Sequence, residues 1–359
     1  MNQPPREDRT LHKRARPARQ RLAPVLKWVG GITAVLSLVF GVVQVWDRVF
    51  GYQTRRRHVE ELLATGRLQQ DQHDFAAAWA SDSQAAQLAG DNHAVRTAQE
   101  DLAMAWLEAA RLNEGETFAA LTTRLAPTLQ RGLLDADGPR RADVLAHLGW
   151  AEFLRSRDGI AGLEPDTLYR RALAVDPQNV YAHTMLGHWI LWRNGSLKEA
   201  KEHFAIALKV GRVHSYVRGM ERAALQNSHD DAAGDELIRV ANDMRAHQEP
   251  IDELTRKAVA DVYSFRVIGG DDAALHDILT ALPPSEHLAT FQLLFGREGD
   301  EDVNRRYILA LLQEAAGARS DALRTLQSLR RVGLLDPRLQ SGIAAAMRRL
   351  SRSQKLGPP

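Results

Sequence analysis

The sequence predicts an all-α protein in which a single N-terminal transmembrane helix is followed by an α-solenoid of stacked helical hairpins. Two observations lead to this prediction. Residues 28–46 contain no charged side chain, and an uncharged stretch of this length is typical of a membrane-spanning helix. After residue 51, Ala and Leu recur with helical periodicity, and short segments rich in Gly, Asp, Asn and Pro interrupt them without an alternating strand pattern.

The charge is distributed unevenly along the chain. The 359 residues carry a formal charge of +2, but residues 1–27 hold eight Lys or Arg against two acids, so that the remaining 332 residues have a net charge of −4. Residues 1–24 are rich in Pro and Arg with little apolar periodicity, which predicts a flexible basic tail. This asymmetry favours a membrane or an acidic partner, and not nucleic-acid binding by the whole protein.

Residues 25–48 are predicted to form the transmembrane helix. At about 1.5 Å per residue, the uncharged segment extends roughly 28 Å, close to the roughly 30 Å hydrocarbon thickness of a bilayer. Trp28 and Trp46 stand at its two ends, where amphipathic rings prefer the membrane–water interface. A buried core helix is an alternative that the length disfavours. A cleaved signal peptide is a second alternative, disfavoured by the long apolar run and by the lack of a small-residue cleavage site after it.

The flanking charges predict the orientation of this helix. Residues 13–27 hold six Lys or Arg and residues 48–62 hold four, so the positive-inside rule favours a cytoplasmic N-terminus. We therefore expect a single-pass protein of the inner (cytoplasmic) membrane with its C-terminal domain in the periplasm or otherwise extracytoplasmic. Thr33, Ser37 and Gly41 recur every four residues on one face. Such a stripe would allow close packing of membrane helices in a homodimer, and chance is the alternative.

Two consecutive segments of the body share one order of residues: a Leu-Gly pair in a first helix, then small and aromatic residues in a second. They are Leu186, Gly187, Ala200, Phe204 and Ala207, preceded by Pro177, and Leu148, Gly149, Tyr169 and Ala172. Small residues let the two helices of a hairpin touch, a large ring fills the space between hairpins, and Pro ends one hairpin before the next. The sequence therefore predicts two stacked hairpins here.

This pattern resembles the tetratricopeptide repeat (TPR), a 34-residue helix–turn–helix unit. The resemblance is strongest over residues 141–212 and looser elsewhere, and it implies a helical solenoid that binds proteins. The expected organisation is a basic tail (1–24), the transmembrane helix (25–48), TPR-like hairpins (52–140), the best-matching pair (141–212), degenerate helical repeats (213–337), a capping helix (338–352) and a short tail (353–359). The capping helix would hide the last apolar face of the solenoid.

In such a solenoid, the first helix of each hairpin lines a concave groove that suits an extended peptide or a partner helix. The register places the following residues in the groove: Asp143, Ala146, Trp150, Phe153, Tyr181, Thr184, His188 and Trp192, with Leu191 as an alternative to Trp192. Exposed aromatic residues would be candidate anchors for a partner. For Trp150, Trp189 and Trp192 the alternative is packing between hairpins.

Charged recognition by this groove is a separate question. TPR domains that grip the acidic C-terminus of heat-shock chaperones carry Lys and Asn where this chain has Thr184 and His188, which disfavours such a carboxylate clamp. Arg218 and Arg222 begin the next hairpin. We interpret them either as solvated surface residues or as contacts to an anionic group.

The sequence contains no constellation typical of an enzyme. The absence of Cys excludes disulfides, thiolate nucleophiles and Cys-based zinc sites, and we find no His-Glu-x-x-His, Gly-x-Ser-x-Gly, Walker or Gly-x-Gly-x-x-Gly motif. We therefore assign no catalytic, cofactor-binding or metal-ligating residue. The leading hypothesis is a membrane-anchored scaffold or adaptor for an unidentified protein partner, accessory to an envelope or secretion process and without nucleic acid. The alternatives are a regulatory or sensor subunit, whose basic tail engages a partner or anionic lipid, and a small-ligand binder or enzyme.

Overall fold

The computed structural model describes residues 52–110, 116–269, 282–296, 302–332 and 335–355. These ranges contain helices joined by turns and no β-strand. The predicted basic tail and transmembrane helix, with Thr33, Ser37 and Gly41, lie outside them. Within the described ranges, no helix combines the length and the apolar character that a membrane crossing requires.

The described residues divide into two compact units, one before and one after the boundary between Leu102 and Ala103. The first contains a helix over residues 52–71, α2 (Phe75–Ala89) and the beginning of α3 (His93–Ala109). Its core is an apolar cluster of Val59, Leu63, Ala85 and Val95. Helix α2 begins after Asp74 because the carboxylate of this residue accepts a hydrogen bond of 3.1 Å from the backbone N–H of Ala77.

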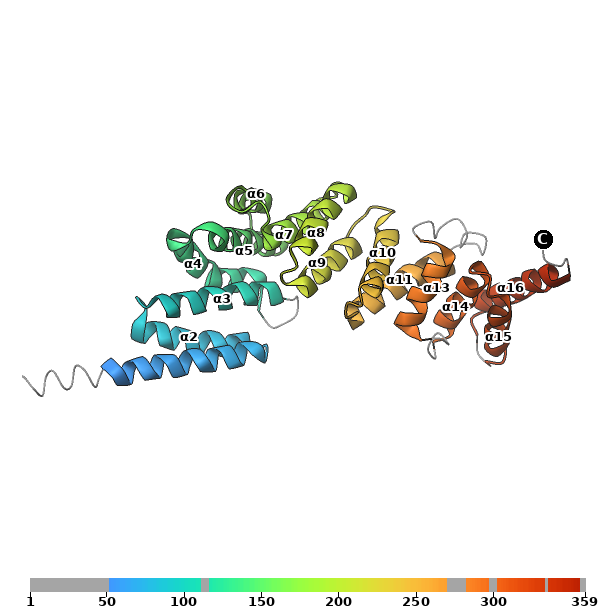
Figure 1. Ribbon diagram of the computed structural model, residues 1–359, viewed down its shortest axis with the longest axis horizontal. Helices are drawn as coiled ribbons and strands as arrows, with labels where there is room; N and C mark the ends of the chain where they lie inside the picture. Colours follow the sequence, from blue (N-terminus) through green and yellow to red (C-terminus); the bar gives the residue numbers. More distant parts are fainter. Residues whose placement is uncertain (1–51, 111–115, 270–281, 297–301, 333–334, 356–359) are drawn as a thin grey trace, which may run out of the picture. The chain divides into compact units, whose positions relative to one another are not determined.

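The second unit continues with helices joined by short connections. They are α4 (Phe118–Asp135), α5 (Gly138–Arg157), α6 (Pro165–Val175), α7 (Val180–Trp192), α8 (Leu197–Val210), α9 (His214–Gln226), α10 (Ala233–Ala246), α11 (Glu253–Gly269), α13 (Pro284–Phe295), α14 (Val303–Ala315), α15 (Arg319–Leu329) and α16 (Pro337–Lys355). Figure 1 shows them in this order. Helices adjacent in sequence pair as hairpins, as in α5–α6, α7–α8 and α14–α15.

Helix α7 also packs against both α5 and α9, so that first helices of successive hairpins lie side by side (Figure 1). Local sequence signals fix these boundaries. Asn179 caps α7 by accepting a hydrogen bond of 2.9 Å from Ala182, and Ser196 caps α8 by accepting one of 3.3 Å from Glu199. Gly211 ends α8 with φ of 78°, a conformation that favours Gly.

The predicted capping helix lies within α16, which packs against α14 and α15. Ile343, Ala346 and Leu350 form its buried face. Gly342 allows a close approach to α14, since a Cβ there would stand 2.5 Å from the hydroxyl oxygen of Tyr307. The region predicted as degenerate repeats is helical in its described parts, where α10 contacts α9, α11 and α13, and α11 contacts α14.

Candidate partner-binding surface

The small residues of the repeat pattern lie at contacts between the two helices of a hairpin. A Cβ added at Gly187 would lie 3.1 Å from the carbonyl oxygen of Ala200 and 3.1 Å from Phe204 Cζ, and one added at Gly149 would lie 2.6 Å from Tyr169 Cε1. The other apolar members of the pattern are also buried: Leu148, Ala172, Leu186, Ala200 and Ala207. Pro177, between the hairpins, accepts a hydrogen bond of 3.0 Å from His183 Nε2 through its carbonyl oxygen. The two glycine contacts let α5 pack closely against α6, and α7 closely against α8.

The predicted groove residues separate into a buried set and a half-buried set. The buried set consists of Ala146, Trp150, Phe153, Thr184 and His188, and the half-buried set of Asp143, Tyr181 and Trp192. Leu191 and Trp189 are buried as well. The buried set therefore does not line an open groove, because side chains of neighbouring helices fill the space in front of it. For Trp150 and Trp189 the structure shows the alternative, packing between helices.

Trp150, Phe153, His188 and Trp192 form an aromatic cluster between α5 and α7. The Trp150 ring stacks on Phe153 at 4.7 Å, and the His188 ring meets both edge-on at 5.3 and 5.1 Å. The indole N–H of Trp150 donates a hydrogen bond of 2.9 Å to the carbonyl oxygen of Leu107, which satisfies its only polar atom. Trp192 is the half-buried edge of this cluster.

His188 is an uncharged member of that cluster. Burial lowers its pKa to about 4, and the nearby positive charge of Arg157 acts in the same direction. The Nδ1 atom has no hydrogen-bond partner among the described residues. At neutral pH the ring therefore packs as a neutral aromatic group, and a position that the sequence suggested for partner contact belongs to the core.

A second set of rings runs across three consecutive first helices, with one ring buried and two partly accessible. His147 of α5 lies 4.6 Å from Tyr181 of α7, which lies 5.8 Å from Tyr216 of α9. We call these three residues the ring ladder. Tyr181 and Tyr216 are half-buried. The repeat register predicts Tyr181 as a groove residue but not His147 or Tyr216, although these two lie 34 residues before and 35 residues after Tyr181, close to the repeat length.

Charged groups border the ring ladder. The Asp143 carboxylate accepts a hydrogen bond of 2.7 Å from Asn179 Nδ2 and lies 3.5 Å from the guanidinium of Arg212. His147 Nδ1 donates to the carbonyl oxygen of Asp143 at 2.7 Å, and Nε2 lies 2.8 Å from a carboxylate oxygen of Glu108. The ladder thus combines aromatic surface with fixed charges.

Arg218 is neither a solvated residue nor an open anion contact. It is buried in α9, and its guanidinium donates to Glu249 at 3.0 and 3.1 Å, to Glu221 at 3.0 Å, and to Asp243. Burial disfavours the charge of Arg218, but the bonds to Glu249, Glu221 and Asp243 hold its pKa above the ordinary value. Arg222, by contrast, is half-buried and donates a hydrogen bond of 2.8 Å to Gln226.

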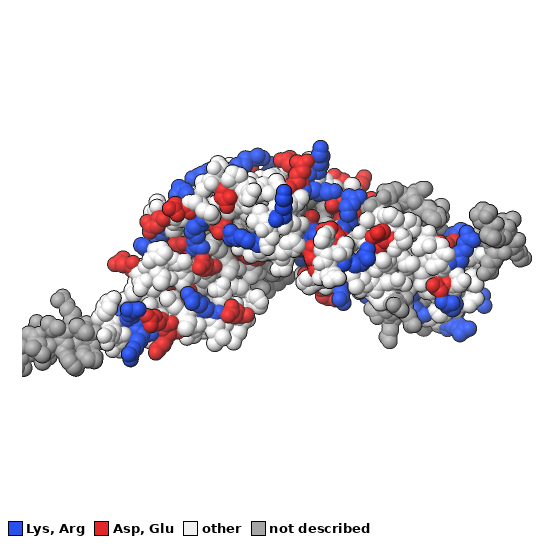
Figure 2. Space-filling model, viewed as in Figure 1, with Lys and Arg blue, Asp and Glu red and all other residues white. Residues whose placement is uncertain are grey.

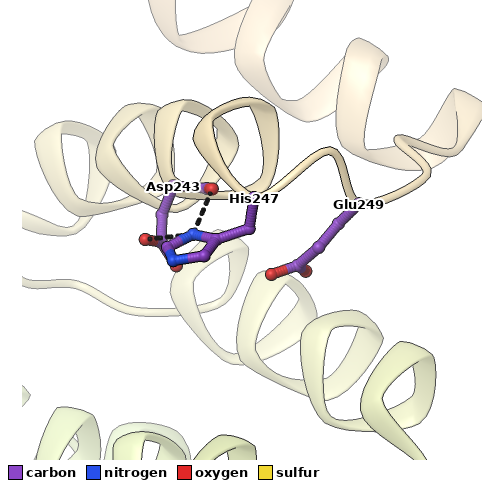
Figure 3. Close-up of side chains that lie close together, drawn as sticks. All are labelled: Asp243, His247 and Glu249. Atoms are coloured by element: carbon purple, nitrogen blue, oxygen red, sulfur yellow. Dashed lines mark hydrogen bonds and ion pairs between the residues drawn. The ribbon is translucent and has the colours of Figure 1, made fainter.

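Asp243, His247 and Glu249 form a cluster of potential metal ligands beside Arg218, with donor atoms within 4.8 Å of one another (Figure 3). His247 Nδ1 is already engaged with Asp243, at 2.9 Å from its carbonyl oxygen and 3.2 Å from its carboxylate. Arg218 binds the carboxylates of Asp243 and Glu249. Because the guanidinium supplies the positive charge that these acids need, the arrangement is a structural ion network that joins α9, α10 and the loop after α10.

Burial also sets the protonation of Glu221 in this network. The desolvated carboxyl has a pKa raised to about 7, although Arg218 favours the charged form. The guanidinium of Arg218 therefore binds three carboxyl groups, and one of them, that of Glu221, is partly protonated at neutral pH. This balance avoids an excess of negative charge between α9 and α10.

Comparisons with known proteins find similarity only to solved structures of low sequence identity. No family model and no curated protein matches the chain. A crystal structure of a tetratricopeptide repeat protein from Parabacteroides merdae aligns with 13% identity over 81% of this chain and 99% of that chain, at a TM-score of 0.39. The TPR domain of P58(IPK) aligns with 12% identity over 83% and 99%, at a TM-score of 0.24. The Gly–ring contacts and the 35-residue spacing of the hairpins make this chain a TPR-like helical repeat protein.

Proposed function

We propose that this protein is a membrane-anchored scaffold that binds a partner protein on the face formed by α5, α7 and α9. The ring ladder is the observation that supports this proposal. It crosses three neighbouring first helices and keeps Tyr181 and Tyr216 partly accessible, whereas the aromatic cluster beside it is largely buried.

The chemistry of this face suits a peptide or a helix of a partner. Tyr offers a rigid apolar ring with a polar tip, and such residues are enriched among the energetically dominant contacts of interfaces. The Arg212 side chain is 54% exposed beside the 13% exposed carboxylate of Asp143. A partner that covers the two Tyr rings would therefore meet an exposed cation at the rim, which contributes orientation more than affinity.

Membrane anchoring is the second part of the proposal and rests on the sequence. The uncharged residues 28–46, with six basic residues in the 15 positions before residue 28, favour a cytoplasmic N-terminus and a repeat domain on the other side of the membrane. A tether raises the local concentration of the repeat domain at the membrane, so that a face of modest affinity is still occupied. An accessory role in envelope assembly or secretion would use this arrangement.

The test is site-specific photocrosslinking in intact membranes. p-Benzoylphenylalanine, which resembles Tyr in size, replaces Tyr181 or Tyr216 in the full chain, and Ile206 of α8 as the control. Ile206 is a 40% exposed apolar residue on the second helix of the same repeat. We expect one discrete partner protein crosslinked from positions 181 and 216 and none from 206. No crosslinked protein from the ladder positions, or the same protein from all three, would overturn the proposal.

A further inference from the structure

The C-terminal end of the second unit contains a hollow between the end of α15 and one face of α16. Its volume is about 780 Å³, within the range of pockets that hold ligands or anchoring side chains. Its apolar lining residues, which we call the floor, are Val332, Leu335, Ile343, Ala344 and Met347, and the uncharged polar residues Gln340 and Ser351 also line it. Met adapts its shape to different apolar partners, so this floor can accept side chains of more than one size.

Four arginines border the hollow: Arg330, Arg331, Arg348 and Arg352. All four are exposed, and none forms an ion pair with another described residue, whereas the neighbouring Arg349 is paired with Glu314 at 2.6 Å. Arg348 and Arg352 are one turn apart on α16, and Arg330 and Arg331 follow α15. Two pairs of guanidinium groups therefore stand at the edges of an apolar floor that contains no acid.

The charge of the surrounding segment strengthens this feature. Residues 330–355 contain six Arg and one Lys against a single acid, Asp336, and Asp336 caps α16 by accepting a hydrogen bond of 2.8 Å from the backbone N–H of Arg338. Figure 2 shows Lys and Arg side chains over the end of the molecule that α15 and α16 form. The segment therefore has a net charge of +6, which favours an anionic ligand.

An acidic segment of another protein that also carries apolar side chains would complement both the four arginines and the apolar floor. Guanidinium groups bind carboxylates in a two-pronged geometry, and the floor needs apolar side chains above it. A membrane surface matches less well, because Val332 is the one exposed large hydrophobic residue among the described residues after position 302, and insertion into lipid uses several such residues. Nucleic acid matches less well because the lining offers no aromatic ring for base stacking.

The basic N-terminal tail of this chain is excluded as the occupant by its charge. Its seven Lys and Arg against two acids would be repelled by the four arginines. The geometry points to a second binding site, distinct from the ring ladder, in which the hollow between α15 and α16 takes an acidic amphipathic segment of a partner protein. Glu or Asp side chains of this segment bind the four arginines, and its apolar side chains rest on the floor.

The experiment uses the full chain and a fluorescent amphipathic peptide composed of Leu and Glu, with fluorescence anisotropy as the readout. Arg348→Glu/Arg352→Glu is the test variant. Arg319→Glu/Arg338→Glu is the matched control, because it makes the same charge change at the same end of the chain outside the lining. We expect the test variant to weaken binding by about tenfold or more, as loss of two charge-assisted contacts implies, and the control to weaken it by less than about threefold, through screened long-range charge alone.

A third variant, Ala344→Trp, tests the floor without a change of charge, since Ala344 is exposed and lines the hollow. We expect weaker peptide binding because the added ring fills the volume. Three results would overturn the inference. The Arg348→Glu/Arg352→Glu variant could bind the peptide as tightly as its control variant, the natural chain could bind a peptide of Leu and Gln as tightly as the peptide of Leu and Glu, or Ala344→Trp could leave peptide binding unchanged. A fourth is Arg348- and Arg352-dependent binding of phosphatidylglycerol vesicles or single-stranded DNA without binding of the peptide.

Discussion

Tyr169 occupies the space that any side chain at position 149 would need. A Cβ at Gly149 would lie 2.6 and 2.8 Å from two atoms of the Tyr169 ring and 3.1 Å from the carbonyl oxygen of Pro165. Because Tyr169 is fully buried, its ring cannot turn away into solvent. Gly149→Ala should therefore lower the free energy of unfolding by about 1–3 kcal/mol, the usual effect of overpacking a core. The urea midpoint, followed by far-UV circular dichroism, measures this effect.

Gly219 of α9 provides the matched control for that substitution, because a Cβ there would meet nothing within 4 Å. Gly219→Ala should raise the free energy of unfolding by about 0.5–1 kcal/mol, since Ala loses less backbone entropy than Gly in a helix. If Gly149→Ala unfolded at the same urea concentration as the natural chain, α5 and α6 would not pack closely enough for a Cβ at position 149 to clash with Tyr169.

The buried His188 should make the unfolding free energy depend on pH. Its folded pKa is lowered to about 4 from 6.5, so above pH 6.5 neither state holds the extra proton. As the pH falls below 6.5, the unfolded chain binds a proton that the folded chain does not. Stability should fall by up to about 3 kcal/mol between pH 6.5 and pH 4 and then level off.

His188→Phe isolates this effect because the new ring is apolar and does not titrate. The variant should lose less stability than the natural chain between pH 6.5 and pH 4, measured by urea unfolding at several pH values. Asp82 and Glu221 act in the opposite direction, since burial raises their pKa to about 6 and about 7 and acid therefore favours the folded state there. Only the difference between the two proteins reports on His188, and identical pH profiles would contradict the assignment.

Arg218 should be the most sensitive charged residue of the α9–α10 region. Arg218→Met leaves Glu221, Asp243 and Glu249 without their common cation, and breaking a buried ion pair in this way destabilises a protein by about 3–5 kcal/mol. Arg170→Met is the control, because Arg170 is 62% exposed and forms a 3.5 Å pair with Asp166; its effect should stay below about 1 kcal/mol. Adding Glu221→Gln to Arg218→Met should recover part of the loss. Similar midpoints for Arg218→Met and Arg170→Met would show that the network is not a stabilising element.

The orientation proposed for the N-terminal segment is testable with reporters fused after Pro359. Alkaline phosphatase, which folds only outside the cytoplasm, should be active in this position, and a cytoplasmic reporter should be inactive. Replacing the six Lys and Arg of residues 13–27 by Gln should reduce the alkaline phosphatase activity, because the charge bias that sets orientation is then reversed. Activity of the cytoplasmic reporter alone would refute the orientation.

The hairpin of α7 and α8 illustrates what the sequence alone can predict. Asn179, Ser196 and Gly211 mark helix ends through local hydrogen bonds and backbone conformation, and such signals need no tertiary information. The spacing of Gly187 and Phe204 also indicates which helix pairs with which, since only a small residue permits that contact.

The side-chain environment of the candidate surface was harder to predict. Helical periodicity places His188 on the first-helix face, but its burial depends on Trp150 and Phe153 from the preceding hairpin. Arg218 likewise meets acids 25 and 31 residues further along, and no local pattern indicates that pairing. The four arginines around the C-terminal hollow come together only because α16 packs against α15.

The nearest-neighbour packing of the second unit has a consequence for how this chain is made. The principal contacts of each helix are with helices a few positions away in the sequence, so no contact between distant ends has to form before the first hairpins become stable. The α5–α8 segment can complete its core while later residues are still being synthesised. Folding from the ribosome should then proceed hairpin by hairpin, and a chain that stops after α8 should retain a folded remnant.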